Sequence, residues 1–272
     1  MTWATFVGAG IVGVLLWRRA RSAGARSAGG RVNGGKVFLV GAGPGGADLL
    51  TLRACECIRR AEVLVVDDLV HPEILRFKPS GCAVIGVPKR GGPNAPKTPQ
   101  SSINELLVHW CATMGKRVVR LKGGDPLIFA RVWPEMLALR EAGCAFELVP
   151  GITSALAAPC AVGIPLTEKA LGTSLTIVSG HAGLAGEDFG VLAQSDTLVV
   201  LMGTRKLRVI CEGLLAGGAP AARPVAIVHA CYRPEQRLLK GTLGDIADQA
   251  EGQALSPAII VIGNVAAFAQ DE

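Results

Sequence analysis

The chain has 272 residues, of which half are hydrophobic and 35 are glycine, while aromatic residues are few. Five arginines that precede the first acidic residue, Asp48, supply most of the net charge of +6, so the remainder is nearly neutral. This composition excludes the basic, aromatic-rich surface that nucleic-acid binding requires, and it supplies a core that needs no disulfide or metal.

Residues 1–35 form an amino-terminal segment that we exclude from the fold. Residues 3–17 are uncharged and mostly apolar, with a tryptophan at each end; a membrane span needs about 17–25 such residues. The following residues are rich in arginine and serine and contain no acid, and residues 22–35 form a tether. Two main hypotheses stay open: a membrane anchor with a cytosolic domain, or a targeting segment for a plastid or mitochondrion. A secretory signal and a disordered extension are further alternatives.

Strand-like and helix-like segments alternate from residue 36 onward, which is typical of an α/β fold. In the first part the predicted strands are 36–40, 62–67, 82–87, 116–121 and 146–149, and the predicted helices are about 48–59, 100–114 and 132–142. After residue 151 the pattern restarts, with strands at 174–179, 197–202, 224–229 and 258–263 and a helix near 205–217. We therefore predict two α/β lobes, 36–150 and 151–272.

The eight cysteines are scattered and form no C-x-x-C pair. The spacing gives no metal site. We interpret them as reduced, mostly buried thiols.

The stretch GAGPGG follows the first predicted strand and places glycines at 41, 43 and 46. This matches G-x-G-x-x-G, the dinucleotide fingerprint, in which the loop holds a pyrophosphate at a helix start. Pro44 weakens that interpretation, because proline removes a backbone N–H that a diphosphate would use. The motif alone favours a nucleotide-type ligand without fixing which one.

Ligands of α/β sheets bind beyond the carboxyl ends of the strands. That rule assigns to one rim the following segments: 41–46, Asp67, Lys89, 123–125, Met202 and 229–231. Residues 149–167 join the lobes, and Thr153 or Ser154 is suited to cap the next helix. A cleft between two lobes is a common place for a small-molecule site, so we expect the active site there.

Several motifs in order carry a resemblance to a known family. They are GAGPG (41–45), VVDDLVHPEIL (65–75), PKRGG (88–92), RVVRLKGGDP (117–126), VPGITSA (149–155), GIPLT (163–167) and LMGTRKL (201–207). This pattern resembles the tetrapyrrole, or class III, S-adenosylmethionine-dependent methyltransferases over about residues 36–265. The combination of RVVRLKGGDP with PGITSA is similar to the uroporphyrinogen-III C-methyltransferases of that family.

The resemblance implies a two-lobe fold, a homodimer and S-adenosylmethionine as methyl donor. The positions that match the family's donor-binding residues are Pro44, Gly123, Gly124, Asp125, Ile128, Thr153, Ser154, Met202 and Cys231. The acceptor would be uroporphyrinogen III, methylated twice to precorrin-2 for sirohaem or cobalamin synthesis. By the same match, Asp67 is the proton acceptor and Lys89 the proton donor, and Arg90, Lys122 and Arg131 are candidates for contacts with the substrate carboxylates.

The chain departs from the family pattern at a few positions. The most informative is Gly46, which stands where the family usually has aspartate. Three alternatives to the uroporphyrinogen enzyme stay open: a related precorrin or diphthine-type methyltransferase, a tethered binding protein without turnover, and a nicotinamide-dependent oxidoreductase. The last is prompted by Asp67, which follows Gly46 at about the 20-residue distance expected of a ribose-binding acid.

Overall fold

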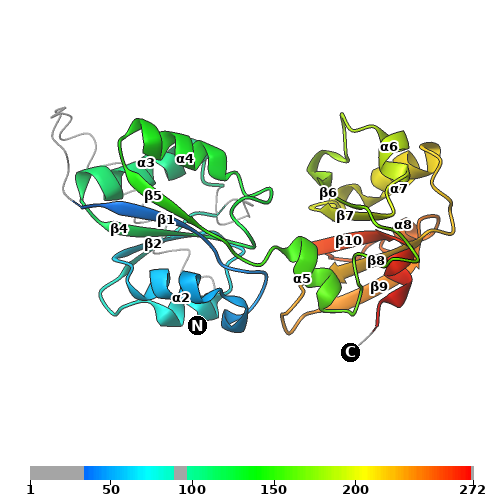
Figure 1. The fold of residues 1–272 in the computed structure, drawn as a ribbon, viewed down its shortest axis with the longest axis horizontal. Helices are drawn as coiled ribbons and strands as arrows, with labels where there is room; N and C mark the ends of the chain where they lie inside the picture. Colours follow the sequence, from blue (N-terminus) through cyan, green and yellow to red (C-terminus); the bar gives the residue numbers. More distant parts are fainter. Residues whose placement is uncertain (1–33, 89–96, 271–272) are drawn as a thin grey trace. The chain divides into compact units, whose positions relative to one another are not determined.

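The computed structural model describes residues 34–88 and 97–270 (Figure 1). The chain divides into two compact units, residues 1–152 and 153–272, close to the predicted boundary after residue 150. The apolar run 3–17 lies outside the described residues. None of the helices within the described ranges has the length and apolar character that a membrane crossing requires.

Unit 1 contains a five-stranded parallel sheet. Its strands follow the order β3-β2-β4-β1-β5, with bounds β1 Lys36–Gly41, β2 Val63–Val66, β3 Ala83–Gly86, β4 Arg117–Lys122 and β5 Ala145–Val149. All five strands were predicted. Their apolar runs identify them because a parallel sheet covered on both faces buries nearly every strand residue.

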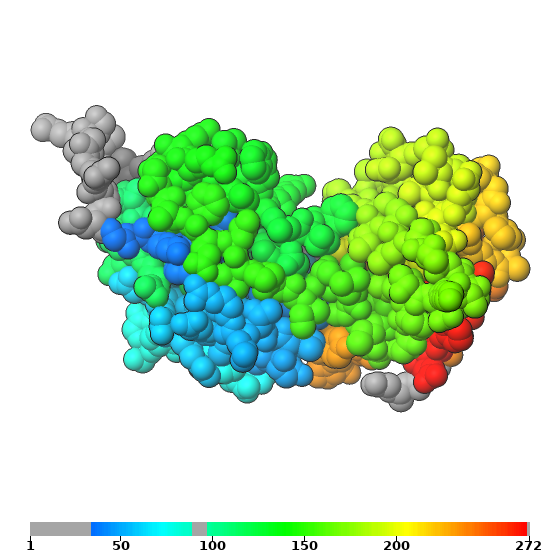
Figure 2. Space-filling model, viewed as in Figure 1, coloured from blue at the N-terminus to red at the C-terminus, as the bar shows by residue number. Residues whose placement is uncertain are grey.

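Helices cover both faces of this sheet. Helix α2, Leu52–Arg59, packs on one face through Ala54, Cys57 and Ile58. Helices α3, Gln100–Val108, and α4, Val132–Glu141, pack on the other face. In Figure 2, α2 (blue) and α4 (green) accordingly lie on opposite sides of unit 1. Two short 3₁₀ segments, η1 Ala47–Leu49 and η2 Pro72–Phe77, connect the strands on the α2 side.

Two predicted helices differ from the observed ones. The first begins at Leu52 rather than near residue 48, because the Thr51 side chain caps it by accepting a hydrogen bond from the Ala54 backbone N–H at 3.1 Å. The second is divided: α3 ends at Val108 and a π-helical turn, η3 His109–Thr113, continues it. Hydrophobic periodicity does not report this change, since an inserted π turn keeps the chain helical.

Unit 2 contains a mixed five-stranded sheet in the order β6-β7-β10-β8-β9. The bounds are β6 Leu175–Ser179, β7 Thr197–Leu201, β8 Pro224–His229, β9 Arg237–Thr242 and β10 Ala258–Gly263. β6 and β7 are parallel, whereas β10 runs antiparallel to both β7 and β8, and β9 runs antiparallel to β8. The sequence did not predict β9, a half-buried edge strand whose residues RLLKGT lack a clean apolar alternation.

Helices also cover both faces of the second sheet. Helices α6 Phe189–Ala193, α7 Leu207–Ala216 and α8 Ile246–Gln249 pack on one face. Helix α5 Ser154–Cys160 and the 3₁₀ segment η6 Asn264–Phe268 pack on the other. Two further 3₁₀ turns, η4 Gly180–Ala182 and η5 Thr204–Lys206, follow β6 and β7.

All eight cysteines are free thiols in the structure. Six of them are buried, Cys55 is half-buried and Cys160 is exposed. The prediction of mostly buried thiols is therefore confirmed.

Candidate functional site

Three loops at the carboxyl ends of β1, β4 and β5 contact one another through the backbone of their glycines. A Cβ atom on Gly41 would lie 2.6 Å from Cα of Gly151, and a Cβ on Gly151 would lie 2.4 Å from the carbonyl oxygen of Gly124. Gly43 and Gly124 exchange two backbone hydrogen bonds, of 3.2 and 2.8 Å. We call these four residues the glycine junction. Its glycines bring the protein's own loops together, before any ligand is considered.

The G-x-G-x-x-G stretch does not form the dinucleotide arrangement. In that arrangement a helix starts within the glycine loop and points its amino end at the pyrophosphate. Here Gly46 is extended, the short turn η1 follows, and α2 begins only at Leu52. The glycine pattern is explained by the junction, and we set the nicotinamide hypothesis aside.

Two carboxylates lie beside position 46. A Cβ on Gly46 would lie 2.8 Å from an Asp48 carboxylate oxygen and 3.3 Å from a Glu73 carboxylate oxygen. The rim of unit 1 thus has acidic groups next to this position although the residue itself carries none. Pro44, a predicted donor-binding residue, is half-buried in the same loop.

Asp125 holds two strand-end loops in place. One carboxylate oxygen accepts a hydrogen bond from the Leu127 backbone N–H at 2.7 Å, and the other accepts one from the Gly151 N–H at 3.1 Å. The side chain is half-buried. Asp125 therefore ties the β4 loop to the β5 loop, next to the glycine junction. The neighbouring Gly123 also has no room for a side chain, since a Cβ there would lie 2.8 Å from Leu69 Cβ.

The loop that leads into α4 exposes apolar side chains. Leu127, Ile128 and Phe129 are all exposed, and Ile128 is one of the predicted donor-binding residues. Phe129 and Arg131 both adopt left-handed backbone angles, with φ of 51° and 55°. Such angles are rare for residues other than glycine and occur often at binding sites. Arg131 is exposed and stands at the amino end of α4.

A cluster of charged side chains is buried between the sheet and α4. Successive residues of a strand face opposite sides, so Arg120 and Lys122 share the face of Val118, which is covered by α3 and α4. Both cationic side chains are fully buried, as is Glu135 in the first turns of α4. Charged side chains are almost never fully buried unless they are paired.

Glu135 and Asp67 provide the negative charges of this cluster. Lys122 Nζ donates to both carboxylate oxygens of Glu135 at 2.9 and 2.8 Å, and Arg120 Nε donates to the same carboxylate at 3.3 Å. Arg120 Nη2 makes an ion pair with Asp67, which is 7% exposed at the carboxyl end of β2. We call Asp67, Arg120, Lys122 and Glu135 the charge cluster; two cations and two carboxylates balance within it.

The environment keeps Arg120 charged. Burial alone would lower the pKa of its guanidinium, but the adjacent carboxylates of Asp67 and Glu135 outweigh that effect and raise the pKa. Arg120 Nη1 also donates to the backbone oxygens of Val65 and Leu121, at 3.3 and 3.0 Å. Every nitrogen of the guanidinium is thus engaged, and its plane is fixed.

The predicted proton donor Lys89 and the predicted substrate contacts Arg90, Lys122 and Arg131 fall into three groups. Lys89 and Arg90 lie outside the described residues. Arg131 is exposed at the rim. Lys122 is fully buried with its ammonium group on Glu135, so in this structure it serves the charge cluster rather than the surface.

In unit 2 the register brings two strand ends together. Leu201 at the end of β7 is opposite Ile259, and His229 at the end of β8 is opposite Ala258. Both strands therefore end beside the start of β10. The Ala230 N–H donates to the Pro257 oxygen at 2.9 Å, which fixes the β8 loop there.

The residues that follow these two strands have unusual backbone angles. Met202, Ala230 and Tyr232 have φ of 57°, 48° and 58°. Met202 and Tyr232 are exposed, whereas Cys231, which lies between Ala230 and Tyr232 in the chain, is buried, and this burial raises the pKa of its thiol to about 11. The predicted donor-binding residues Met202 and Cys231 thus lie in a strained rim, as is frequent at ligand sites.

Thr153 and Ser154 stand at the start of α5. Thr153 is the cap: its hydroxyl accepts a hydrogen bond from the Ala155 N–H at 3.3 Å, and Ser154 is the first helical residue. Both side chains are half-buried. The sequence pattern had left the choice of cap between them open.

Sequence reasoning missed two residues of these rims. Arg120 and Glu135 complete the charge cluster, and their signal was an arginine and a lysine inside an otherwise apolar buried strand. His229 is 8% exposed, and its Nδ1 has no hydrogen-bond partner among the described residues. The strand-end rule had already assigned residues 229–231 to the rim, so the new finding is the state of this nitrogen.

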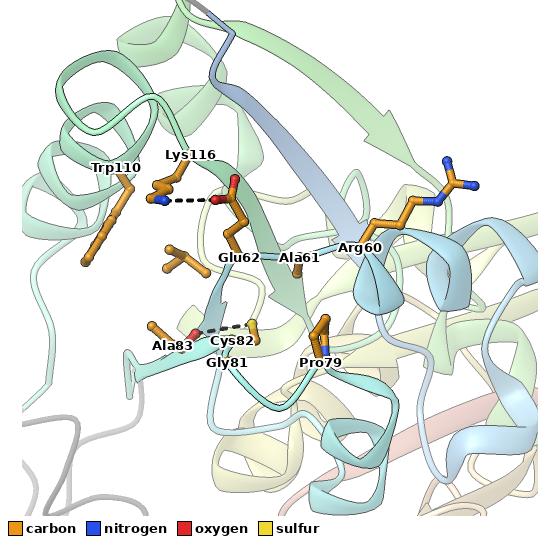
Figure 3. Close-up of a pocket in the computed structure, with 10 residues that line it drawn as sticks. Arg60, Ala61, Glu62, Pro79, Gly81, Cys82, Ala83, Trp110 and Lys116 are labelled. Atoms are coloured by element: carbon orange, nitrogen blue, oxygen red, sulfur yellow. Dashed lines mark hydrogen bonds and ion pairs between the residues drawn. The ribbon is translucent and has the colours of Figure 1, made fainter.

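A pocket of about 440 Å³ lies at the opposite end of the first sheet (Figure 3). Its lining residues precede strands: Glu62 precedes β2, Cys82 precedes β3 and Lys116 precedes β4. Lys116 pairs with Glu62 at 2.9 Å, and the Arg117 N–H donates to Glu62 at 2.8 Å; these bonds hold the pKa of that carboxyl low. Since ligands of such sheets bind at the carboxyl ends, we assign this pocket a structural role.

Comparison with known proteins gives a consistent set of similarities. The family model described as tetrapyrrole (corrin/porphyrin) methylases matches residues 36–247. A uroporphyrinogen-III C-methyltransferase of Synechococcus elongatus is 44% identical over 230 residues, which cover 85% of this chain and 93% of that protein.

Two further matches are a longer relative and a solved structure. A sirohaem synthase of Aeromonas hydrophila is 43% identical over 236 residues, and the match covers 86% of this chain but 49% of that longer protein. The crystal structure of uroporphyrin-III C-methyltransferase from Thermus thermophilus complexed with S-adenosylhomocysteine is 35% identical, with a TM-score of 0.73 and coverage of 85% of this chain and 98% of that one.

Proposed function

This chain belongs to the tetrapyrrole (corrin/porphyrin) methylase family, and we propose that it transfers two methyl groups from S-adenosylmethionine to uroporphyrinogen III, forming precorrin-2. Membership of this family identifies the chain as a methyltransferase with the two-lobe fold. The observation that carries the proposed chemistry is Asp67, a carboxylate held by a buried arginine at the carboxyl end of β2.

Each methyl transfer releases one proton, and a group in the site must accept it. Bound S-adenosylmethionine supplies an electrophilic methyl on a sulfonium. A pyrrole β-carbon forms the new C–C bond, the S–CH₃ electron pair returns to sulfur, and the alkylated macrocycle then loses one proton. The Asp67 carboxylate is suited to take that proton, because Arg120 orients it and it lies at the rim where ligands of such sheets bind.

The described residues fit the donor in both units. In unit 1 the exposed Ile128 offers apolar surface next to Asp125 and the glycine junction. In unit 2 the exposed thioether of Met202 and the polar start of α5, at Thr153 and Ser154, offer a similar mixture. Such apolar walls with a few fixed polar groups suit an adenosyl sulfonium, which carries no phosphate. That these two sets of residues act on one ligand stays a prediction.

The substrate carries carboxylates, so exposed cations are the contacts to expect. We propose Arg131 and Arg90 for this role and Lys89 as the proton donor. For Lys122 we propose support of the charge cluster, since its ammonium is buried on Glu135. The homodimer, the use of precorrin-2 in sirohaem or cobalamin synthesis, and membrane anchoring by residues 3–17 stay predictions.

The test is turnover by the purified full chain. With uroporphyrinogen III and S-adenosylmethionine, mass spectrometry should show a product with two added methyl groups, and calorimetry should show binding of S-adenosylhomocysteine. A parallel titration with NADH should show no binding. Absence of S-adenosylhomocysteine binding, or methylation of a later precorrin instead of uroporphyrinogen III, would overturn the proposal.

A further inference from the structure

We propose that Arg120 and Glu135 are positioning residues for Asp67, because the two carboxylates compete for one buried guanidinium and this competition sets the direction and the basicity of the Asp67 carboxylate. The inference rests on the proposed function for its catalytic meaning. Its physical content, a coupling between Asp67 and a glutamate that it does not touch, stands on the geometry of the charge cluster alone.

The coupling runs through a continuous series of hydrogen bonds and ion pairs. Arg120 Nη2 binds Asp67, and Arg120 Nε binds Glu135 Oε1 at 3.3 Å. Lys122 Nζ binds both oxygens of Glu135, at 2.9 and 2.8 Å. Gln100 Nε2 donates to Glu135 Oε1 as well, at 3.3 Å. Five side chains, from β4, α3, α4 and the end of β2, therefore share one network.

The guanidinium has no freedom to rotate away from this arrangement. Arg120 Nη1 donates to the oxygens of Val65 and Leu121, so the nitrogens that face Asp67 and Glu135 are fixed in direction. An arginine presents its donors in a rigid planar fork, and here each part of the fork has an acceptor. The Asp67 carboxylate is thereby directed by the sheet itself.

Glu135 determines how strongly Arg120 stabilises the anionic form of Asp67. Glu135 is fully buried, where charge interactions are screened far less than at the surface. A stronger hold of Glu135 on Arg120 weakens the stabilisation of the Asp67 anion and makes Asp67 a better proton acceptor. Lys122 and Gln100 act in the opposite sense, because they satisfy Glu135 and leave Arg120 to Asp67.

The charged groups near Asp67 come from several elements. β4 contributes Arg120 and Lys122, α4 contributes Glu135, and α3 contributes the neutral Gln100. Asp68 is the next residue in the chain and is half-buried. Asp67 is 7% exposed, whereas the other three members of the charge cluster are fully buried. Asp67 is therefore the member of the cluster that can meet a ligand at the rim.

Two variants that leave the Asp67–Arg120 contact in place separate this proposal from a purely structural role. Glu135→Gln removes the competing charge and should lower the titration midpoint of Asp67. Lys122→Met removes the cation that satisfies Glu135 and should raise it. Each change should be about 0.5–1 pH unit, the order expected of one charge at second-neighbour distance in a partly screened interior.

The midpoint is measured by ¹³C NMR of carboxyl-labelled aspartate in the full chain, with Asp67→Asn for assignment. The control is Glu147→Gln, which removes a carboxylate of the same sheet that is held by Lys36 at 2.7 Å and by Arg53. That control should leave the Asp67 midpoint unchanged. Circular dichroism reports which variants fold.

Shifts of opposite sign support the proposal, and shifts of the same sign or of none overturn it. If Glu135→Gln does not fold, Gln100→Leu takes its place: loss of its bond leaves Glu135 more available to Arg120, so the midpoint should rise as in Lys122→Met. Absence of a rise in both would overturn the coupling.

The same variants distinguish this inference from the proposed function. In active protein, the acid limb of kcat against pH should move with the NMR midpoint, while KM for uroporphyrinogen III stays near the wild-type value. Opposite NMR shifts in a chain that does not methylate uroporphyrinogen III would uphold the coupling and reject the proposed function. Normal methylation without the NMR shifts would do the reverse.

Discussion

The two units build their strand-end rims from different materials. In unit 1 the buried polar side chains of the described residues are the four of the charge cluster, whereas in unit 2 they are Thr197 and His229. Unit 2 instead places Met202, Ala230 and Tyr232 in left-handed backbone angles where its strands end. The first rim concentrates charge, and the second concentrates backbone strain.

The difference indicates a division of labour. A buried, balanced set of charges suits the movement of a proton, because it fixes the direction and basicity of one carboxylate. A strained, largely neutral rim suits the binding of a ligand through its shape, because the strain holds side chains such as Met202 in directions that relaxed loops would not offer. The predictions below test this division, starting with the largest expected effect.

Asp67→Asn should remove the proton acceptor from the rim of unit 1. We expect methyl transfer to fall by about 10²–10⁴-fold, the usual size of general-base catalysis, while binding of S-adenosylhomocysteine stays as in wild type. Initial rates of product fluorescence and calorimetry measure the two quantities. The control is Asp68→Asn, which should keep most of the rate; an equal loss in both variants would show that the rim has no single acceptor.

Gly151→Ala should damage the frame that holds the first rim. The added methyl group would lie 2.4 Å from the Gly124 oxygen, so the loops must separate. We expect a loss of about 1–3 kcal/mol in the free energy of unfolding, as for other overpacked sites. Urea denaturation measures it. Gly81→Ala, where nothing lies within 4 Å of the added atom, should change stability far less.

Ala230→Gly should relieve strain in the second rim. A left-handed angle costs a non-glycine residue roughly 1–2 kcal/mol, partly offset by the greater freedom of glycine in the unfolded chain. We therefore expect a gain of about 0.5–1 kcal/mol in stability together with weaker binding of S-adenosylhomocysteine. The matched change Ala216→Gly, in α7, should lower stability by up to about 1 kcal/mol. A loss of stability in Ala230→Gly would contradict the role of strain.

Cys231 should take no part in proton chemistry at neutral pH. Burial raises the pKa of its thiol to about 11, so Cys231→Ala should leave the pH dependence of turnover unchanged. Iodoacetamide should label the exposed Cys160 well before Cys231, as peptide mass spectrometry will show. Because the folded pKa lies above the ordinary thiol value of about 8.5, the stability that this thiol contributes is complete below that pH and is lost as pH rises toward 11.

Local pattern predicted the strands of the first sheet well, because a covered parallel sheet needs continuous apolar runs and RVVRL or EVLVVD supply them. It failed at β9, which is the edge strand of the second sheet and pairs with β8. It also placed the start of α2 too early, since Thr51 rather than the glycine loop caps that helix. Each failure involves an element whose limits are set by a partner or a cap and not by periodicity.

The candidate site shows the same limit. The strand-end rule assigned Asp67, Gly124 and Met202 to the rims, because the rule needs only the positions where strands end. The role of Glu135 was not accessible in this way: its partners Arg120 and Lys122 lie on another element, and only the fold brings them within hydrogen-bond distance. For Gly41 and Gly43, the pattern indicated close approach but not that the approaching group is the protein's own backbone.

The glycine junction has a mechanical consequence. The loops after β1, β4 and β5 are in contact at Gly41, Gly124 and Gly151, with no side chain between them to yield. None of these loops can be displaced without carrying the other two along, so the rim of unit 1 has one degree of freedom where three separate loops would have three. A ligand that contacts any one of these loops is therefore held by all three together.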